Sequence, residues 1–345
     1  MSLSEPSILL IKLSSLGDVI HALPALEALR SLYPKARLTW LVEDTYAPVL
    51  AGHPALDEVW PVPRPHPGNG RFGENLMELF HTARRLREEP FDLVIDLQGL
   101  LKSAVWVALA RGARKLGYRC TREFSYLALT ERLAPFDPEA HAVWRYLNVA
   151  RHLGAPAEPP RFRLGLTPPE DLSHLLSPAT GRPLAVLHPG ARWPTKLWPG
   201  AHWAQLAEWL VRDKDFQVIL TGSPGDRGLV EEIAAQAEAP LLNLAGRTSL
   251  AELAAVLRKA RVAVTTDTGP MHLAAALETP VVALFGPTAP WRTGPFGHGH
   301  EVVRLDLPCS PCFQRRCPEP RCLRDLPVSA AREAVEKILV RRKNP

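Results

Sequence analysis

The chain has 345 residues, 46% of them hydrophobic and 22% charged, and a formal net charge of +5. This length predicts two domains, and the composition is typical of a globular protein. No apolar run reaches the roughly 18–20 residues that span a bilayer, and the run at 8–13 contains Lys12 and is too short for a signal-peptide core, so we expect a cytoplasmic protein. The mild positive charge suits a polyanionic acceptor or peripheral contact with an acidic membrane surface, whereas no basic-aromatic motif favours nucleic acid as a partner.

Strand and helix patterns alternate along the first 160 residues, which we predict to form one domain. The expected strands are 8–13, 37–42 and 93–97, and the expected helices are 19–32, 100–110 and 141–153. A kink is expected at Pro24, and the proline- and glycine-rich stretch 61–73 is expected to be an exposed loop. Such alternation predicts a parallel sheet covered by helices.

The proline-rich residues 161–182 are predicted to link this domain to a second one over 183–328. The second domain repeats the alternation of strands and helices. Its expected strands are 184–188, 217–221, 262–266 and 281–285, and its expected helices are 203–211, 249–259 and a short one from Pro270. The last segment, 329–345, carries an amphipathic and basic helix. Both halves therefore belong to the α/β class.

The segment 262–288 predicts half of a nucleotide pocket. Its first strand ends at Asp267, Thr268 and Gly269, and Pro270 suits the first turn of the helix that follows. Free backbone N–H groups at such a helix start attract phosphate. His272 lies in the same first turn, where it either donates to a phosphate or packs as an ordinary helix histidine.

Asp18 closes the turn that joins the first strand to the first helix. It is either a helix-start carboxylate stabilised by the helix dipole or a general base exposed at the carboxyl end of the strand. Only Gly17 is present in this turn, so it lacks the glycine pattern of dinucleotide-binding proteins.

Two further strand ends in the second half carry glycine-containing turns. Gly190 and the nearby Lys196 could hold a diphosphate without a metal, although a surface loop with a solvated lysine explains them equally well. Asp226 is either a ribose ligand or a turn residue. Three such strand ends within about 100 residues predict one shared pocket.

Four cysteines gather near the C-terminus. Cys309, Cys312, Cys317 and Cys322 have the spacing C-x2-C-x4-C-x4-C. They predict either a structural zinc or iron–sulfur site or a set of reduced thiols in a folded loop.

Four stretches carry a resemblance to a known family. They are KLSSLGDVIHALPAL (12–26), DLQGLLKSA (96–104), LHPGARWPTKLWP (187–199) and TDTGPMHLAAALETPVVALFGPT (266–288). The chain resembles glycosyltransferase family 9, the ADP-heptose:lipopolysaccharide heptosyltransferases. The stretch CSPCFQRRC (309–317) is similar to members like heptosyltransferase II, whereas the first stretch is closer to heptosyltransferase I, so both subclasses stay open.

The resemblance implies a GT-B fold, in which two Rossmann-like, doubly wound domains face a central cleft. The acceptor would bind the first domain and the ADP-sugar the second, and the last helix would cross back to the first domain. The implied reaction is an inverting transfer of L-glycero-D-manno-heptose from ADP-heptose to an inner-core acceptor, Kdo–lipid A or a heptosylated one, with no cofactor required. Two alternatives stay open: a transferase of the same fold with another nucleotide sugar and acceptor, and a nucleotide-binding protein without turnover.

The resemblance also assigns roles to residues. Asp18 would be the general base, and Lys196 would neutralise the departing diphosphate. The donor-binding residues would be Thr268, Gly269 and His272 at the phosphates, Asp267 at the heptose, Asp226 at the ribose, and Gly190. Asp226 stands where the family usually has a longer glutamate. The acceptor-binding residues would be Ser15, Lys102 and Arg64, although the loop around Arg64 is poor in basic residues.

Overall fold

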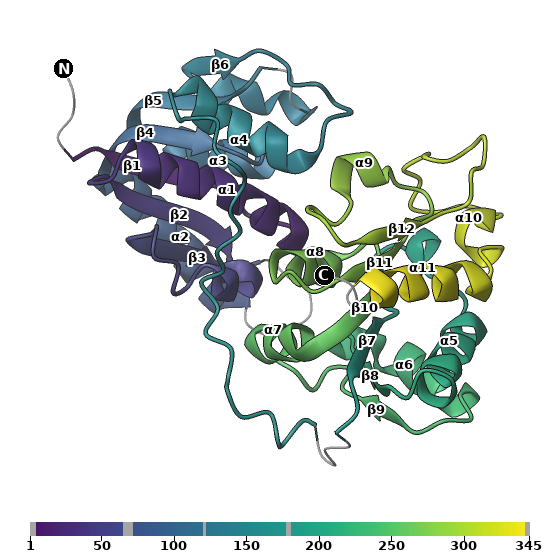
Figure 1. Cartoon of the computed structure of the whole chain (residues 1–345). Helices are drawn as coiled ribbons and strands as arrows, with labels where there is room; N and C mark the ends of the chain where they lie inside the picture. Colours follow the sequence, from purple (N-terminus) through teal and green to yellow (C-terminus); the bar gives the residue numbers. More distant parts are fainter. Residues whose placement is uncertain (1–4, 65–71, 120–121, 177–180, 342–345) are drawn as a thin grey trace. The chain divides into compact units, whose positions relative to one another are not determined.

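The computed structural model describes residues 5–64, 72–119, 122–176 and 181–341 (Figure 1). The chain divides into two compact units, residues 1–166 and 167–345, and the division falls within the expected linker 161–182. Each unit contains one six-stranded parallel sheet. Among the described residues, no helix has the length and apolar character needed to cross a membrane.

The sheet of the first unit has the strand order β3-β2-β1-β4-β5-β6. Its strands are β1 (Ser7–Ile11), β2 (Arg37–Glu43), β3 (Glu58–Val62), β4 (Pro90–Asp96), β5 (Arg111–Tyr118) and β6 (Glu131–Leu133). The helices are α1 (Leu16–Leu32), α2 (Phe72–Glu88), α3 (Leu101–Leu109) and α4 (Ala142–His152), with shorter turns η1 (Asp44–Val49) and η2 (Arg122–Ala128). Leu9, Leu10 and Val94 are fully buried because the central strands are covered on both faces.

The sheet of the second unit has the order β12-β11-β10-β7-β8-β9. Its strands are β7 (Leu184–His188), β8 (Gln217–Leu220), β9 (Leu241–Asn243), β10 (Ala260–Thr266), β11 (Val281–Leu284) and β12 (Glu301–Val303). The helices are α5 (Gly200–Arg212), α6 (Arg227–Gln236), α7 (Leu250–Lys259), α8 (Gly269–Ala276), α9 (Pro290–Thr293), α10 (Arg321–Arg324) and α11 (Val328–Arg341), with turns η3 (Pro194–Lys196) and η4 (Pro224–Asp226). A reciprocal capping box begins α7, since Ser249 N–H donates to Glu252 Oε2 at 2.7 Å and Glu252 N–H to Ser249 Oγ at 3.2 Å.

Both sheets reverse their winding direction at one point. In the first unit the chain adds β2 and β3 on one side of β1, then β4, β5 and β6 on the other. In the second unit β8 and β9 lie on one side of β7, and β10, β11 and β12 on the other. Such a reversal leaves a crevice at the carboxyl ends of two adjacent strands, and ligands of open α/β sheets bind there. The strand order therefore indicates sites after β1 and β4 and after β7 and β10.

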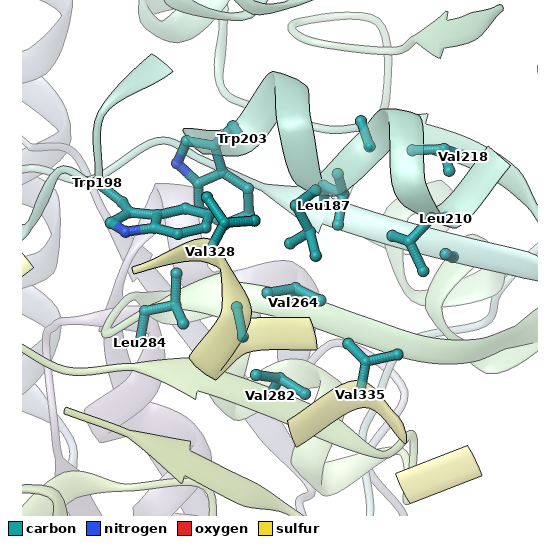
Figure 2. Packing of buried hydrophobic residues seen from close by; sticks show 14 of the residues in the cluster. Leu187, Trp198, Trp203, Leu210, Val218, Val264, Val282, Leu284, Val328 and Val335 are labelled. Carbon is teal, nitrogen blue, oxygen red and sulfur yellow. The ribbon is translucent and has the colours of Figure 1, made fainter. Parts of the chain in front are cut away.

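The C-terminal helix α11 belongs to the core of the second unit. Its Val328 and Val335 pack in one apolar cluster with Val282 and Leu284 of β11 (Figure 2). The helix also contacts α5, β10 and β12. Its apolar face is thus buried within the second unit, and its expected return to the first domain stays a prediction.

The structure corrects two expectations in the first unit. The stretch 61–73 is not one loop, because Pro61 and Val62 end β3 and Gly73 lies in the first turn of α2; residues 65–71 lie outside the described part. The helix around Pro24 begins at Leu16, three residues earlier than expected, and runs to Leu32 as one element. β5 and α2 were not expected at all.

Candidate active site

Asp18 lies in the first turn of α1, directly after the central strand β1. Its Oδ2 accepts hydrogen bonds from the N–H of Ser15 at 3.1 Å and from the Ser15 hydroxyl at 3.0 Å. Its Oδ1 accepts from the Tyr146 hydroxyl at 3.0 Å and lies 3.8 Å from the ammonium of the buried Lys12. Asp18 therefore does serve as a helix-start carboxylate, and its side chain is still 35% exposed. Ser15, predicted at the acceptor, holds Asp18 through these bonds, and its contact with an acceptor stays a prediction.

The charge of Asp18 is stabilised by its neighbours. Burial alone would raise the pKa of this carboxyl, but the Lys12 ammonium and the hydrogen bonds from Ser15 outweigh it and hold the pKa well below its usual value. Asp18 is therefore ionised throughout the physiological range.

Lys102 reaches the same edge of the sheet from α3. Its ammonium pairs with Glu43 Oε1 at 2.7 Å and also donates to the Ser14 hydroxyl. The Gln98 side chain, in the turn after β4, accepts from the Ser14 N–H at 3.1 Å and so joins the turns after β1 and β4. Glu43, which ends β2, was not predicted to belong to the site. Because Glu43 compensates the charge of Lys102, this lysine attracts an anion less strongly than an unpaired lysine would.

Lys196 and Asp267 meet at the switch point of the second sheet. The Lys196 ammonium lies 2.6 Å from Asp267 Oδ2 and 3.1 Å from the Asp267 carbonyl oxygen. The Thr288 hydroxyl donates to the same Oδ2 at 2.6 Å. The side chains of Lys196 and Asp267 are only 15% and 7% exposed, so this ion pair is shielded from water. The structure thus brings together two residues predicted for the donor site and adds Thr288 to them.

A buried tryptophan fixes the loop that carries Lys196. Trp198 packs edge to face on Trp203 of α5, with ring centroids 5.1 Å apart (Figure 2), and donates its indole N–H to the Leu326 carbonyl at 2.9 Å. An indole N–H that is buried needs such a partner. Lys196 precedes Trp198 by two residues, so its backbone is anchored close to a rigid position of the core.

The cysteine-containing loop lies against the Lys196 turn. The Thr195 hydroxyl donates to the Gln314 carbonyl at 2.8 Å, and the Arg315 guanidinium lies 5.1 Å from the centroid of the Trp193 ring. The Lys196 ammonium lies 4.6 Å from the centroid of that same ring. Two cations thus contact one indole, as the negative face of an aromatic ring allows. Neither Trp193 nor Arg315 was singled out in the sequence.

Gly190 and Asp226 touch each other after β7 and β8. A Cβ at Gly190 would lie 2.6 Å from the carboxylate carbon of Asp226, so a larger residue there would require the Asp226 side chain to move. Asp226 Oδ2 accepts from the N–H and the hydroxyl of Ser223 at 2.8 and 2.6 Å, which makes it a turn residue. Its contact with a ribose stays a prediction. Nearby, burial lowers the pKa of His188 to about 4.

The helix α8 begins where the sequence predicts. Thr268 is its N-cap residue, with its hydroxyl 3.3 Å from the Thr266 carbonyl, and Gly269 is the first helical residue. His272 is buried in the first turns of this helix. The start of α8 therefore adjoins Asp267; Pro270 has no backbone N–H, and the N–H of Met271 donates to the Thr268 carbonyl at 3.1 Å.

In the described part of the chain, the structure does not bring the predicted acceptor residue Arg64 together with Lys102. Arg64 follows β3, beside residues outside the described part, and no contact within the described residues joins it to Lys102.

The four cysteines have free thiols, exposed at 309 and 312 and half-buried at 317 and 322. Burial raises the pKa of the Cys322 thiol, and the neighbouring Cys312 and Cys309 add to this shift. In the described ranges, no group of three or more Cys, His, Asp or Glu side chains is arranged to hold a metal ion. A zinc or iron–sulfur site therefore stays a prediction.

The model of glycosyltransferase family 9 (heptosyltransferase) matches residues 79–323. The chain belongs to this family. The lipopolysaccharide heptosyltransferase 1 of Pseudomonas aeruginosa is 38% identical over 322 residues, which cover 90% of this chain and 87% of that relative. The chain is therefore a glycosyltransferase, as its resemblance implied.

Solved structures of family 9 share the fold. The E. coli ADP-heptose lps heptosyltransferase II is 27% identical with a TM-score of 0.77, over 98% of this chain and 99% of that one. The E. coli heptosyltransferase WaaC with ADP is 28% identical with a TM-score of 0.75, over 96% and 99% of the two chains. The predicted GT-B fold is thus confirmed, with one doubly wound parallel sheet in each unit.

Proposed function

We propose that this family 9 glycosyltransferase moves L-glycero-D-manno-heptose from ADP-heptose to the inner core of lipopolysaccharide. The relatives named lipopolysaccharide heptosyltransferase and the solved relative with ADP support this substrate class. The observation that carries the proposal is a charged cluster at each switch point: Asp18 with Lys12 in the first unit, and Lys196 with Asp267 in the second.

The second unit supplies the donor half of the site. Lys196 and Arg315 offer positive charge to the diphosphate, and Gly269 offers its backbone N–H at the start of α8. Because Oδ2 of Asp267 is occupied by Lys196 and Thr288, we assign its Oδ1 to the heptose hydroxyls. His272 and Thr268 would complete the phosphate contacts, and Asp226 the ribose contact.

The first unit supplies the base. In the transfer, the acceptor hydroxyl oxygen attacks the anomeric carbon while the bond from that carbon to the diphosphate oxygen breaks, and the configuration inverts. Asp18 takes the hydroxyl proton, and ADP leaves with the electron pair. The charge that develops on ADP is balanced by Lys196 and Arg315, so the reaction as proposed needs no metal ion. Tyr146 and Ser15 keep the Asp18 carboxylate oriented toward the acceptor side.

The acceptor in this proposal is an anionic glycolipid, Kdo–lipid A or its heptosylated form. Lys102 and Arg64, on the first unit, would meet its acidic groups, with Glu43 setting the position of Lys102. Such an acceptor is held in a membrane, so we place the enzyme at the inner face of the cytoplasmic membrane as a peripheral protein.

A transfer assay with a matched pair of variants tests the proposal. The purified chain is given ADP-heptose and a panel of acceptors that includes Kdo–lipid A and heptosylated lipid A. We expect Asp18→Asn to keep ADP affinity but to lose transfer by about 10²–10⁴-fold, whereas Asp44→Asn, an exposed aspartate of the same unit, keeps both.

Each other outcome has a defined meaning. A fully active Asp18→Asn variant would remove Asp18 as the base. Transfer only from a UDP- or GDP-sugar would favour the same fold with another donor. Tight ADP binding without transfer to any acceptor would favour a nucleotide-binding protein without turnover.

A further inference from the structure

Exposed apolar side chains are concentrated on one part of the first unit. Among the described residues, eleven large hydrophobic side chains are exposed, and seven of them belong to α2, α3 and η2. These seven are Leu76, Met77, Phe80, Leu101, Val105, Phe124 and Leu127, with exposed fractions of 51–71%. We call them the α2–α3–η2 face. An apolar patch of this kind on a soluble surface marks an interaction site.

The seven side chains lie on adjoining elements. Leu76, Met77 and Phe80 share one side of α2, because residues three and four apart are neighbours on a helix. Leu101 and Val105 share one side of α3 for the same reason. The helix α3 contacts both α2 and η2, and the Leu101 N–H donates to the Glu123 side chain of η2 at 2.9 Å.

The core of the unit does not need this face. Leu86 of α2 and Val107 of α3 are fully buried in the apolar cluster beneath the sheet. Each helix therefore buries one side and presents a second apolar side to the outside. The second apolar side is not covered by the core of the first unit, so only another partner could bury it.

The face borders the edge of the sheet that holds Asp18. The helix α3 follows β4, and η2 follows β5, so both begin at the carboxyl ends of parallel strands. Asp18 and Lys102 lie at the same edge, and Leu101 is the residue before Lys102. A partner seated on the face would thus lie next to the groups assigned to the acceptor.

Positive charge surrounds the α3–η2 part of the face. The segment 101–132 has seven basic residues and two acidic ones. Both acids are engaged, since Glu123 accepts from Leu101 and Glu131 pairs with Arg114 at 2.8 Å. Arg132 lies over the Tyr126 ring of η2, at 5.3 Å from its centroid. Within the described residues, no ion pair joins Arg132 or Arg119 to a carboxylate.

We propose that the α2–α3–η2 face inserts its apolar side chains into the surface of an anionic lipid bilayer. Exposed aromatic and aliphatic side chains beside unpaired arginines fit that surface, because acyl chains accept the former and acidic headgroups the latter. Glu74 and Glu78 of α2 oppose this attraction, so the anionic lipids bind on the α3–η2 side. Docking would bring the sheet edge with Asp18 and Lys102 to a lipid-linked acceptor, and this last step rests on the proposed function.

Vesicle co-sedimentation tests the docking surface without any donor or acceptor. The full chain is mixed with vesicles of phosphatidylethanolamine and phosphatidylglycerol, or of phosphatidylcholine alone. We expect binding to the anionic vesicles only. The triple variant L76S/M77S/F80S and the double variant F124S/L127S should each lower the partition coefficient by about tenfold or more.

The matched control is V302S/V340S, which changes two exposed valines of the second unit and should bind like the unaltered chain. Thermal unfolding verifies that the variants fold. Equal binding to both kinds of vesicle, or unchanged binding of both face variants, overturns the proposal. So does a dimer in light scattering that these variants dissociate while vesicle binding persists, since a second copy would then cover the face.

The same variants separate this inference from the proposed function. On a water-soluble acceptor without acyl chains, the face variants should transfer heptose at the rate of the unaltered chain. Vesicle binding without any transfer leaves the docking surface standing and removes the proposed function, whereas transfer without vesicle binding does the reverse.

Discussion

Oδ2 of Asp267 holds the ammonium of Lys196 at 2.6 Å, where the turns after β7 and β10 meet. Both side chains are mostly shielded from water. Asp267 compensates the charge of Lys196 until an anion arrives, because a buried charge without a partner is costly. A diphosphate would then share the lysine with Asp267.

Removal of Lys196 should weaken diphosphate binding specifically. We expect Lys196→Met to lower the affinity for ADP by about tenfold or more and to leave the affinity for adenosine unchanged, because a charge-assisted hydrogen bond contributes about 1.5–3 kcal/mol. Isothermal titration calorimetry measures both. The control is Lys214→Met, which breaks an ion pair of the same 2.6 Å length with Glu336. An equal loss for adenosine would mean that the fold, not the phosphate contact, is changed.

The same variant should also cost stability. Lys196→Met leaves the carboxylate of Asp267 buried, and among the described side chains the Thr288 hydroxyl is then its only partner. We expect a loss of roughly 3–5 kcal/mol in the free energy of unfolding. The double variant K196M/D267N should recover most of this stability without recovering ADP affinity, and urea unfolding checks the first part.

Arg315 should act as a second cation for the donor. Its guanidinium and the Lys196 ammonium contact the same Trp193 ring, so a phosphate near Lys196 is within reach of both side chains. We expect Arg315→Gln to reduce ADP affinity severalfold. The neighbouring exposed Arg316 provides the matched control, and Arg316→Gln should bind ADP normally. If the two variants bind ADP alike, Arg315 has no place in the site.

Lys12 should set the acid limb of the pH–rate profile. Because its ammonium lowers the pKa of Asp18, Lys12→Met should raise that pKa, and Asp18 should then become protonated at a higher pH. We expect the acid limb of kcat/KM to move to higher pH. The exposed Lys35 supplies the control variant Lys35→Met. A lower rate with an unmoved limb would assign Lys12 a purely structural role.

The sequence predicts the central strands well because they are short, fully buried apolar runs. β1, β7 and β10 are confirmed within two residues at each end. β5 was missed because Arg111–Tyr118 carries charges and glycines, and its backbone is stabilised by pairing with β4 and β6 rather than by an apolar pattern. α2 was missed because its exposed apolar side chains blur the helical pattern.

The site residues likewise divide into those that a local pattern predicts and those that depend on tertiary contacts. Residues within one strand–turn–helix unit, such as Asp267 and Thr268, could be predicted because the chemistry is local. Tyr146 reaches Asp18 across 128 residues, and Gln314 reaches Thr195 across 119. Contacts of that kind depend on how α4 packs on α1 and how the cysteine-containing loop folds back, which no local pattern encodes.

The cysteines should react unequally with a thiol reagent. Cys309 and Cys312 are exposed, whereas burial raises the pKa of Cys322 and leaves less thiolate at neutral pH. We therefore expect two thiols to react quickly and Cys322 slowly, as mass spectrometry of the labelled peptides can resolve. Protection of all four until a chelator is added, with about one zinc or iron per chain by elemental analysis, would instead establish a metal site.

His188 should make the second unit sensitive to acid. Burial lowers the pKa of His188 from its ordinary value of 6.5 to about 4 in the folded state. Between these values the unfolded chain binds a proton that the folded chain excludes, so stability is complete above about pH 6.5 and falls as the pH drops toward 4. From pH 7.5 to pH 5 the loss in the free energy of unfolding should be roughly 2 kcal/mol.

His188→Asn removes this titration and offers a polar group to Thr221, whose hydroxyl lies 3.0 Å from Nδ1. Urea unfolding at both pH values should show a flatter dependence for His188→Asn but not for His298→Asn, an exposed histidine of the same unit. An unchanged slope in His188→Asn would show that His188 does not carry the acid sensitivity.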